Sequence, residues 1–177
     1  VTLTLTSPNL ENLTLTGSAA INGTGNAEAN VLIDNTANNR LVGNAGNDTY
    51  DGAVGNDILT DNSTTSNDVY RWGVGQGNDR ITDAGGSDRV EVGAGVVASQ
   101  VSLVRNGSNL EVRISGATDV LTMVNWYSAT ANRIETIALA DVTIVNAGTV
   151  APLSVVAAAA SRETMTLRAR EPVGATR

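Results

Sequence analysis

An apolar residue recurs every nine positions in the middle of the chain, and this spacing constrains the fold more than any other feature. The recurring residues are Leu32, Leu41, Tyr50 and Leu59. A small polar residue lies two positions before each of them: Asn30, Asn39, Asp48 and Asp57. The same pattern returns at slightly irregular intervals at Asp68, Asp79 and Asp88. Each repeat therefore predicts a loop of about six residues followed by a strand of about three, with one side chain pointing inward.

Strands this short are not stable alone, so the chain has to coil. If every second repeat stacks on the one before it, parallel strands hydrogen-bond along the stack. One coil then holds two repeats, or eighteen residues where the spacing is regular. This stacking predicts three carboxylate pairs: Asp48 with Asp68, Asp57 with Asp79, and Asp68 with Asp88. The sequence thus favours an all-β chain built as a parallel β-roll.

The composition restricts which cation could neutralise these carboxylates. The chain contains no Cys and no His, which excludes zinc or haem sites built on thiolate or imidazole, and Ser-His or Cys-His catalysis. Glycine-rich loops let main-chain carbonyls turn inward beside the aspartates. Ligand sets made only of oxygen suit Ca²⁺, which takes about six to eight of them, better than Mg²⁺. The candidate ligands are five carboxylates and four loop carbonyls: Asp48, Asp57, Asp68, Asp79, Asp88, Gly43, Ala45, Gly52 and Val54.

Two consecutive segments, Gly43–Asp51 and Gly52–Thr60, resemble the RTX or hemolysin-type calcium-binding nonapeptide, G-G-x-G-x-D-x-U-x. Asn44 and Ala53 replace the second glycine of this pattern. Asparagine tolerates the left-handed backbone conformation, whereas alanine does so poorly. We therefore expect a distorted turn at Ala53.

The two preceding repeats, Gly25–Ile33 and Asp34–Val42, carry Asn30 and Asn39 where the family has its aspartate. We expect these loops to hold Ca²⁺ weakly or not at all. The resemblance implies a calcium-binding, C-terminal part of a larger protein that a Gram-negative bacterium exports through type I secretion machinery. It also implies a secreted, extracellular location, where Ca²⁺ drives folding.

The regions on either side of the repeats also contain strand patterns. Alternating residues near the N-terminus predict strands that begin the roll, which we assign to residues 1–95. Asn106-Gly107 predicts a hairpin, and further strands follow. We interpret residues 96–148 as an antiparallel β capping domain that covers the open end of the roll. Residues 149–177 form a tail that contains a possible helix and could be part of a secretion signal.

Charge and isolated motifs limit the other functions. Residues 1–100 contain nine Asp, three Glu and four Arg, so nucleic acid is not an expected partner. We expect no membrane span and no catalytic site in this segment. Isolated acidic residues are interpreted as surface charge rather than a catalytic pair, and the aromatic residues downstream as core: Glu11, Glu111, Glu135, Asp141, Trp72, Trp126 and Tyr127. The alternatives are a polysaccharide-binding or adhesin module that grips a cell surface, and an accessory domain of an upstream secreted enzyme.

Overall fold

The computed structural model describes residues 1–139 and the backbone of 143–145. Two predictions lie outside these residues, namely the surface charge of Asp141 and the tail from residue 149 onward. Everything described is β-structure, loops and two short 3₁₀ turns, η1 (Ala98–Gln100) and η2 (Thr130–Asn132). The prediction of an all-β chain is therefore confirmed.

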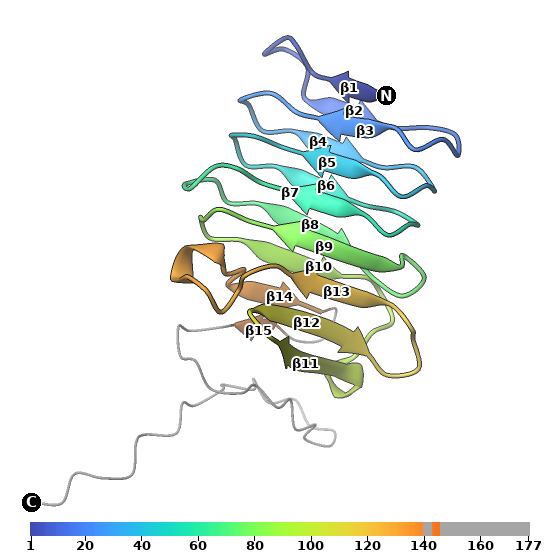
Figure 1. The fold of residues 1–177 in the computed structure, drawn as a ribbon, viewed down its shortest axis with the longest axis vertical. Coiled ribbons are helices and arrows are strands. Elements are labelled where there is room, and N and C mark those ends of the chain that lie inside the picture. Colours follow the sequence, from blue (N-terminus) through green and yellow to red (C-terminus); the bar gives the residue numbers. More distant parts are fainter. Residues whose placement is uncertain (140–142, 146–177) are drawn as a thin grey trace, which may run out of the picture.

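The strands form two sheets that face each other along the length of the molecule (Figure 1). Sheet A contains, in spatial order, β1 (Thr2–Thr4), β3 (Asn22–Thr24), β5 (Arg40–Val42), β7 (Ile58–Thr60), β9 (Asn78–Thr82), β13 (Val120–Met123), β12 (Asn109–Ile114) and β11 (Val101–Asn106). Sheet B contains β15 (Thr143–Val145), β14 (Thr136–Ala138), β10 (Arg89–Val92), β8 (Val69–Trp72), β6 (Thr49–Asp51), β4 (Val31–Ile33) and β2 (Asn12–Thr14).

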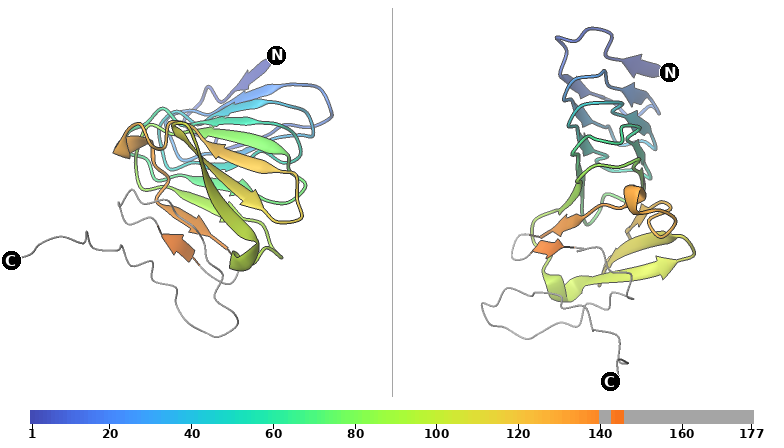
Figure 2. Two further views of the ribbon diagram at one scale, coloured as in Figure 1. Left: turned by 60° about the horizontal axis from the view of Figure 1, so that its bottom comes forward. Right: turned by 90° about the vertical axis from the view of Figure 1, so that its left-hand side faces the viewer.

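The chain alternates between the sheets, so that each coil adds one parallel strand to each of them. The result is a β-solenoid of about five turns, seen obliquely and from the side in Figure 2. Strand β4 pairs with β6 so that Leu32 faces Tyr50, and β6 pairs with β8 so that Tyr50 faces Tyr70. The predicted pairing of every second repeat is thus confirmed.

The core is a narrow column of apolar side chains between the sheets. Leu32, Leu41 and Tyr50 are completely buried, and Leu59 is 1% exposed. Trp72 and Trp126 are 1% and 2% exposed, which confirms that these scarce aromatics serve the core. In β4 to β7 a single inward apolar residue per repeat is therefore enough to fill the space between the short strands, whereas β8 and β10 each contribute two.

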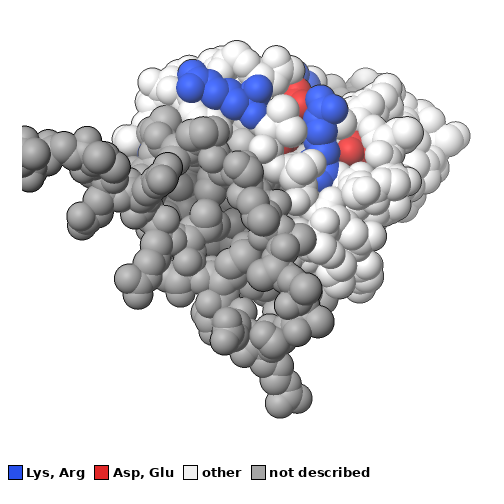
Figure 3. Space-filling model, turned by 90° about the horizontal axis from the view of Figure 1, so that it is seen from below, with Lys and Arg blue, Asp and Glu red and all other residues white. Residues whose placement is uncertain are grey.

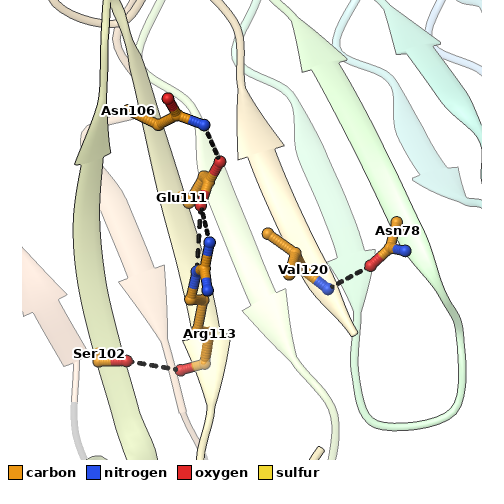
Figure 4. Close-up of polar contacts among 6 residues, drawn as sticks. All are labelled: Asn78, Ser102, Asn106, Glu111, Arg113 and Val120. Carbon is orange, nitrogen blue, oxygen red and sulfur yellow. Dashed lines mark hydrogen bonds and ion pairs between the residues drawn. The ribbon is translucent and has the colours of Figure 1, made fainter. Parts of the chain in front are cut away.

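A ladder of asparagine side chains links successive coils outside the core. The Oδ1 atom of Asn38 accepts the N–H of Asn56 at 2.9 Å, and that of Asn56 accepts the N–H of Asn78 at 2.7 Å. Asn78 in turn accepts the N–H of Val120 at 2.9 Å (Figure 4). A parallel ladder joins Asn47 to the coil that follows it. These bonds use no cation, and they fix the stacking register at each loop.

The segment after the repeats is more closely integrated with the roll than the sequence suggested. The predicted hairpin is confirmed, because β11 and β12 pair antiparallel around Gly107. Strand β13, however, pairs in parallel with β9, and β14 pairs in parallel with β10. The sequence analysis expected only antiparallel strands here. These two strands extend both parallel sheets by one more coil before the antiparallel strands begin.

Two of the acidic residues that we interpreted as surface charge are not free surface charges. Glu111 is 6% exposed and accepts hydrogen bonds from Asn106 and Arg113 in the β11–β12 hairpin (Figure 4). Glu135 is half-buried directly before β14, and its carboxylate accepts the main-chain N–H of Asp88. At this end of the molecule, basic side chains lie on the surface with acidic ones beside them (Figure 3). The interpretation of Glu111 and Glu135 as surface charge was therefore wrong.

Ala53 adopts the same left-handed conformation as Asn44, the equivalent residue of the preceding repeat. Its φ is 53°, compared with 82° at Asn44. The expected distortion is absent at this residue, which adopts a strained conformation instead. Replacing Ala53 with glycine should therefore raise the free energy of unfolding by about 0.5 to 1 kcal/mol at saturating Ca²⁺. Thermal or urea unfolding measures the change.

Ala45 provides the matched control for this substitution, because it lies in the preceding loop outside the left-handed region. The Ala45→Gly substitution should lower the free energy of unfolding by a similar amount, since glycine adds only freedom to the unfolded chain. Destabilisation by both glycines would contradict the assigned strain at Ala53.

Candidate metal centre

The loops between strands form two opposite faces of the solenoid. Face I contains the loops that run from sheet A to sheet B, at residues 25–30, 43–48, 61–68 and 83–88. Face II contains the loops that run from sheet B to sheet A, at residues 34–39, 52–57 and 73–77. The chain therefore presents stacked loops of similar sequence along each face.

The predicted aspartate pairs form in the predicted register. The main-chain N–H of Asp48 donates to Oδ1 of Asp68 at 2.7 Å, and that of Asp68 donates to Oδ1 of Asp88 at 2.8 Å. On face II, the N–H of Asp57 donates to Oδ1 of Asp79 at 2.8 Å. All five side chains are at most 2% exposed. One carboxylate oxygen of the later aspartate in each pair is thus used to hold the coils together.

The second oxygen of several of these carboxylates has no protein partner although it is buried. This is the case for Oδ2 of Asp48, Asp57 and Asp88. Oδ2 of Asp34 and Oδ1 of Asp61 share this state. A buried polar atom without a partner costs about 1 to 3 kcal/mol, and more if it is charged. Such oxygens fit bound cations on each of the two faces, which would satisfy them.

Face I brings carboxylates together in threes. Asp48, Asp61 and Asp68 form one group and Asp68, Asp83 and Asp88 form the next; within each group, one oxygen from every residue lies within 4.8 Å of the others. We call these the first and second carboxylate groups. Asp68 belongs to both. Close carboxylates with oxygen-only surroundings match the ligand preference of Ca²⁺.

Sequence analysis missed Asp61 and Asp83, which are 1% and 4% exposed. Each lies directly after a sheet A strand, at the beginning of a face I loop. The signal was available as an aspartate that follows an apolar strand and precedes the repeat aspartate by five to seven residues. Ser66 also lies in this region, with its hydroxyl within hydrogen-bond distance of Asp61 and Asp68.

Glycine at position 43 is required by the closeness of these groups. A Cβ atom there would collide with the Asp48 carboxylate and the Tyr50 hydroxyl. A Cβ at Gly52 would lie 3.2 Å from Oδ2 of Asp57. The structure places Ala45 and Val54 in the same two loops, and the role of the four main-chain carbonyls as ligands stays a prediction.

The first loop of face I differs from the later ones, because amide groups take the place of carboxylates. Nδ2 of Asn26 donates to the carbonyls of Ser7 and Leu10 at 2.7 and 2.8 Å. Oδ1 of Asn30 accepts the N–H of Asn26 at 2.8 Å, and its Nδ2 donates to Oδ1 of Asn26 at 3.1 Å. These groups satisfy one another without an ion, which supports the expectation of weak Ca²⁺ binding at this loop.

Asn39 on face II is less completely bonded. Its Nδ2 donates to Asp34 and Asn35, while its Oδ1 is buried without a partner. Oδ2 of Asp34 and of Asp57 are in the same state. This loop therefore offers more free oxygen than its asparagine suggested, and the expectation of weak binding there stays a prediction.

Burial dominates the electrostatics of these carboxylates. Together with the charge of neighbouring carboxylates, it raises the pKa of Asp48 and Asp61 to about 7 and that of Asp88 to about 8. On face II, burial followed by the charge of Asp57 raises the pKa of Asp79 to about 7. The pKa values rise because the charged forms are desolvated and repel one another. A divalent cation removes both penalties.

Comparison with known families identifies the repeats. The model for the RTX calcium-binding nonapeptide repeat (four copies) matches residues 24–59 and 74–96. The chain carries RTX calcium-binding repeats. The model for the haemolysin-type calcium binding protein related domain matches residues 109–149, which include β12 to β15.

The RTX repeats support a calcium-binding module of RTX type, with Ca²⁺ as the expected ion. The RTX match does not include residues 60–73, where Asp61, Ser66 and Asp68 lie. This part of face I is therefore recognised through the stacking of the coils. In the part of the chain that the structure describes, there is no helix with the length and apolarity needed to cross a membrane.

Proposed function

We propose that this RTX module folds around Ca²⁺ ions held between stacked loops, and that ion binding drives the assembly of the roll. The observation that carries this proposal is the set of buried carboxylate oxygens without a protein partner on stacked aspartates. Without an ion, these groups oppose folding through desolvation and mutual repulsion. Because the groups assemble only in the folded roll, the binding free energy becomes folding free energy.

The proposed ligands on face I are the first and second carboxylate groups, with Asp68 shared between neighbouring sites. On face II they are Asp57 and Asp79. Main-chain carbonyls of Gly43, Ala45, Gly52 and Val54 complete the oxygen shells. This assignment adds Asp61 and Asp83 to the ligands predicted from the sequence.

The ligand assignment predicts different effects for Asp57→Ala and Asn30→Ala. Removal of the Asp57 carboxylate should lower the number of bound Ca²⁺ ions or weaken their affinity by about tenfold or more, since a charged ligand is lost. Removal of the Asn30 amide should leave both quantities nearly unchanged, because this loop is satisfied by amide hydrogen bonds. Isothermal titration calorimetry with Ca²⁺ measures both. Equal effects of the two substitutions would show that the assigned ligands are wrong.

We further propose that the module works outside the cell after type I secretion, as the C-terminal part of a larger protein, with no catalytic role of its own. At low Ca²⁺ concentration the repelling carboxylates keep the chain loose enough for export, and at extracellular Ca²⁺ it folds. In this proposal residues 1–95 form the roll with the repeats and residues 96–148 the cap, whose strands β13 and β14 continue the two parallel sheets. Expression with and without a type I exporter, followed by assay of the medium, tests the route. Equal amounts in the medium would contradict it.

A further inference from the structure

Two tyrosines connect the apolar core to the carboxylates of face I. Tyr50 and Tyr70 occupy the inward position of β6 and β8, and both side chains are completely buried. Their rings are stacked, with centroids 4.8 Å apart and planes 13° from parallel. The next residue in the same row is Val90, which is equally buried and carries no polar group. Core packing alone therefore does not require a hydroxyl at this position.

The two hydroxyls have different partners. The hydroxyl of Tyr70 donates to Oδ2 of Asp83 at 2.7 Å. The hydroxyl of Tyr50 donates to the main-chain carbonyl of Thr60 at 3.2 Å. The Tyr70 hydroxyl is thus bonded to a carboxylate of the second carboxylate group. The Tyr50 hydroxyl is bonded to an uncharged main-chain carbonyl near the first carboxylate group.

The bond from Tyr70 fixes the position of Asp83. Oδ1 of Asp83 accepts the N–H of Gly85 at 2.8 Å, so that each carboxylate oxygen has one donor and the plane of the group is set. Each oxygen keeps a lone pair for a cation.

We propose that Tyr70 is a positioning residue for the second carboxylate group, and that it orients Asp83 for Ca²⁺ without touching the ion. This inference rests on the proposed calcium function of face I. Hydrogen bonds that orient metal ligands are typically worth about 10- to 100-fold in metal affinity. The hydroxyl therefore tunes one calcium site from within the core.

Replacement by phenylalanine tests this role, because the ring stays in the stack and only the hydroxyl is lost. The Tyr70→Phe substitution should weaken one Ca²⁺ site by about tenfold, with an unchanged number of ions at saturation. The Tyr50→Phe substitution is the matched control and should change every affinity by less than about threefold, since its partner is a neutral carbonyl. Calorimetric titration of the full chain with Ca²⁺ gives the affinities.

A double substitution separates positioning from general stability. In the Asp83→Asn background, Tyr70→Phe should no longer weaken Ca²⁺ binding, because the carboxylate that it orients is gone. Wild-type affinity in Tyr70→Phe, even with a lower melting temperature, would overturn the positioning role and leave the proposed function standing. Equal weakening by the two phenylalanines would also overturn it. Absence of Ca²⁺ binding by the wild-type protein would instead overturn the proposed function, and this inference with it.

Discussion

Addition of Ca²⁺ to the chelated protein is expected to produce a large rise in the β-sheet signal of circular dichroism and in the melting temperature. The reason is that the carboxylates of face I and face II are buried, and that several of their oxygens have no protein partner. Each occupied site should add about 2.7 kcal/mol at a hundredfold excess of free Ca²⁺ over its dissociation constant. With more than one site, the melting temperature should keep rising with the logarithm of the Ca²⁺ concentration.

Mg²⁺ at equal concentration is the control for this experiment. It should give a much smaller change, since it demands a compact octahedral shell and gives up its water reluctantly. Excess chelator should reverse the effect of Ca²⁺. A spectrum and melting temperature that do not respond to chelator would exclude the metal-driven folding that we propose.

Without Ca²⁺, the free energy of unfolding is expected to fall as the pH rises from about 4 to about 8. Burial raises the pKa of Asp57 and Asp68 to about 6, of Asp48, Asp61 and Asp79 to about 7, and of Asp88 to about 8. An unfolded aspartate titrates near 3.9, so the folded chain binds more protons across this range. The stabilising effect is complete below about pH 4 and is lost as the pH passes through the folded-state pKa values.

With Ca²⁺ present, the pH dependence of ion binding should have the opposite sign. Protons and Ca²⁺ compete for the same oxygens, so lowering the pH from about 8 to about 5 should weaken Ca²⁺ binding. Thermal unfolding in chelator at both pH values, together with Ca²⁺ titrations at both, measures the two trends. A chelated protein that is equally stable at both pH values would contradict the electrostatic account of the carboxylate groups.

The β-roll itself was predictable because its information is local and periodic. The nine-residue spacing identified Leu32, Leu41, Tyr50 and Leu59 as core, and each is at most 1% exposed. Alternate repeats stack because a single short strand has no other way to bury its apolar side chain. The same rule gave the three aspartate pairs in the correct register.

The sequence by itself thus determined the coil, its register and the family of its repeats. The tertiary structure decided which further groups lie beside the stacked aspartates: Asp61, Asp83, Glu135, and the hydroxyl of Tyr70. The physical reason is distance along the chain. Asp88 donates its N–H to Glu135, 47 residues later, across an intervening hairpin whose length no local period specifies. Tyr70 and Asp83 meet because two sheets face each other, and a period read along one strand does not show what lies across the core.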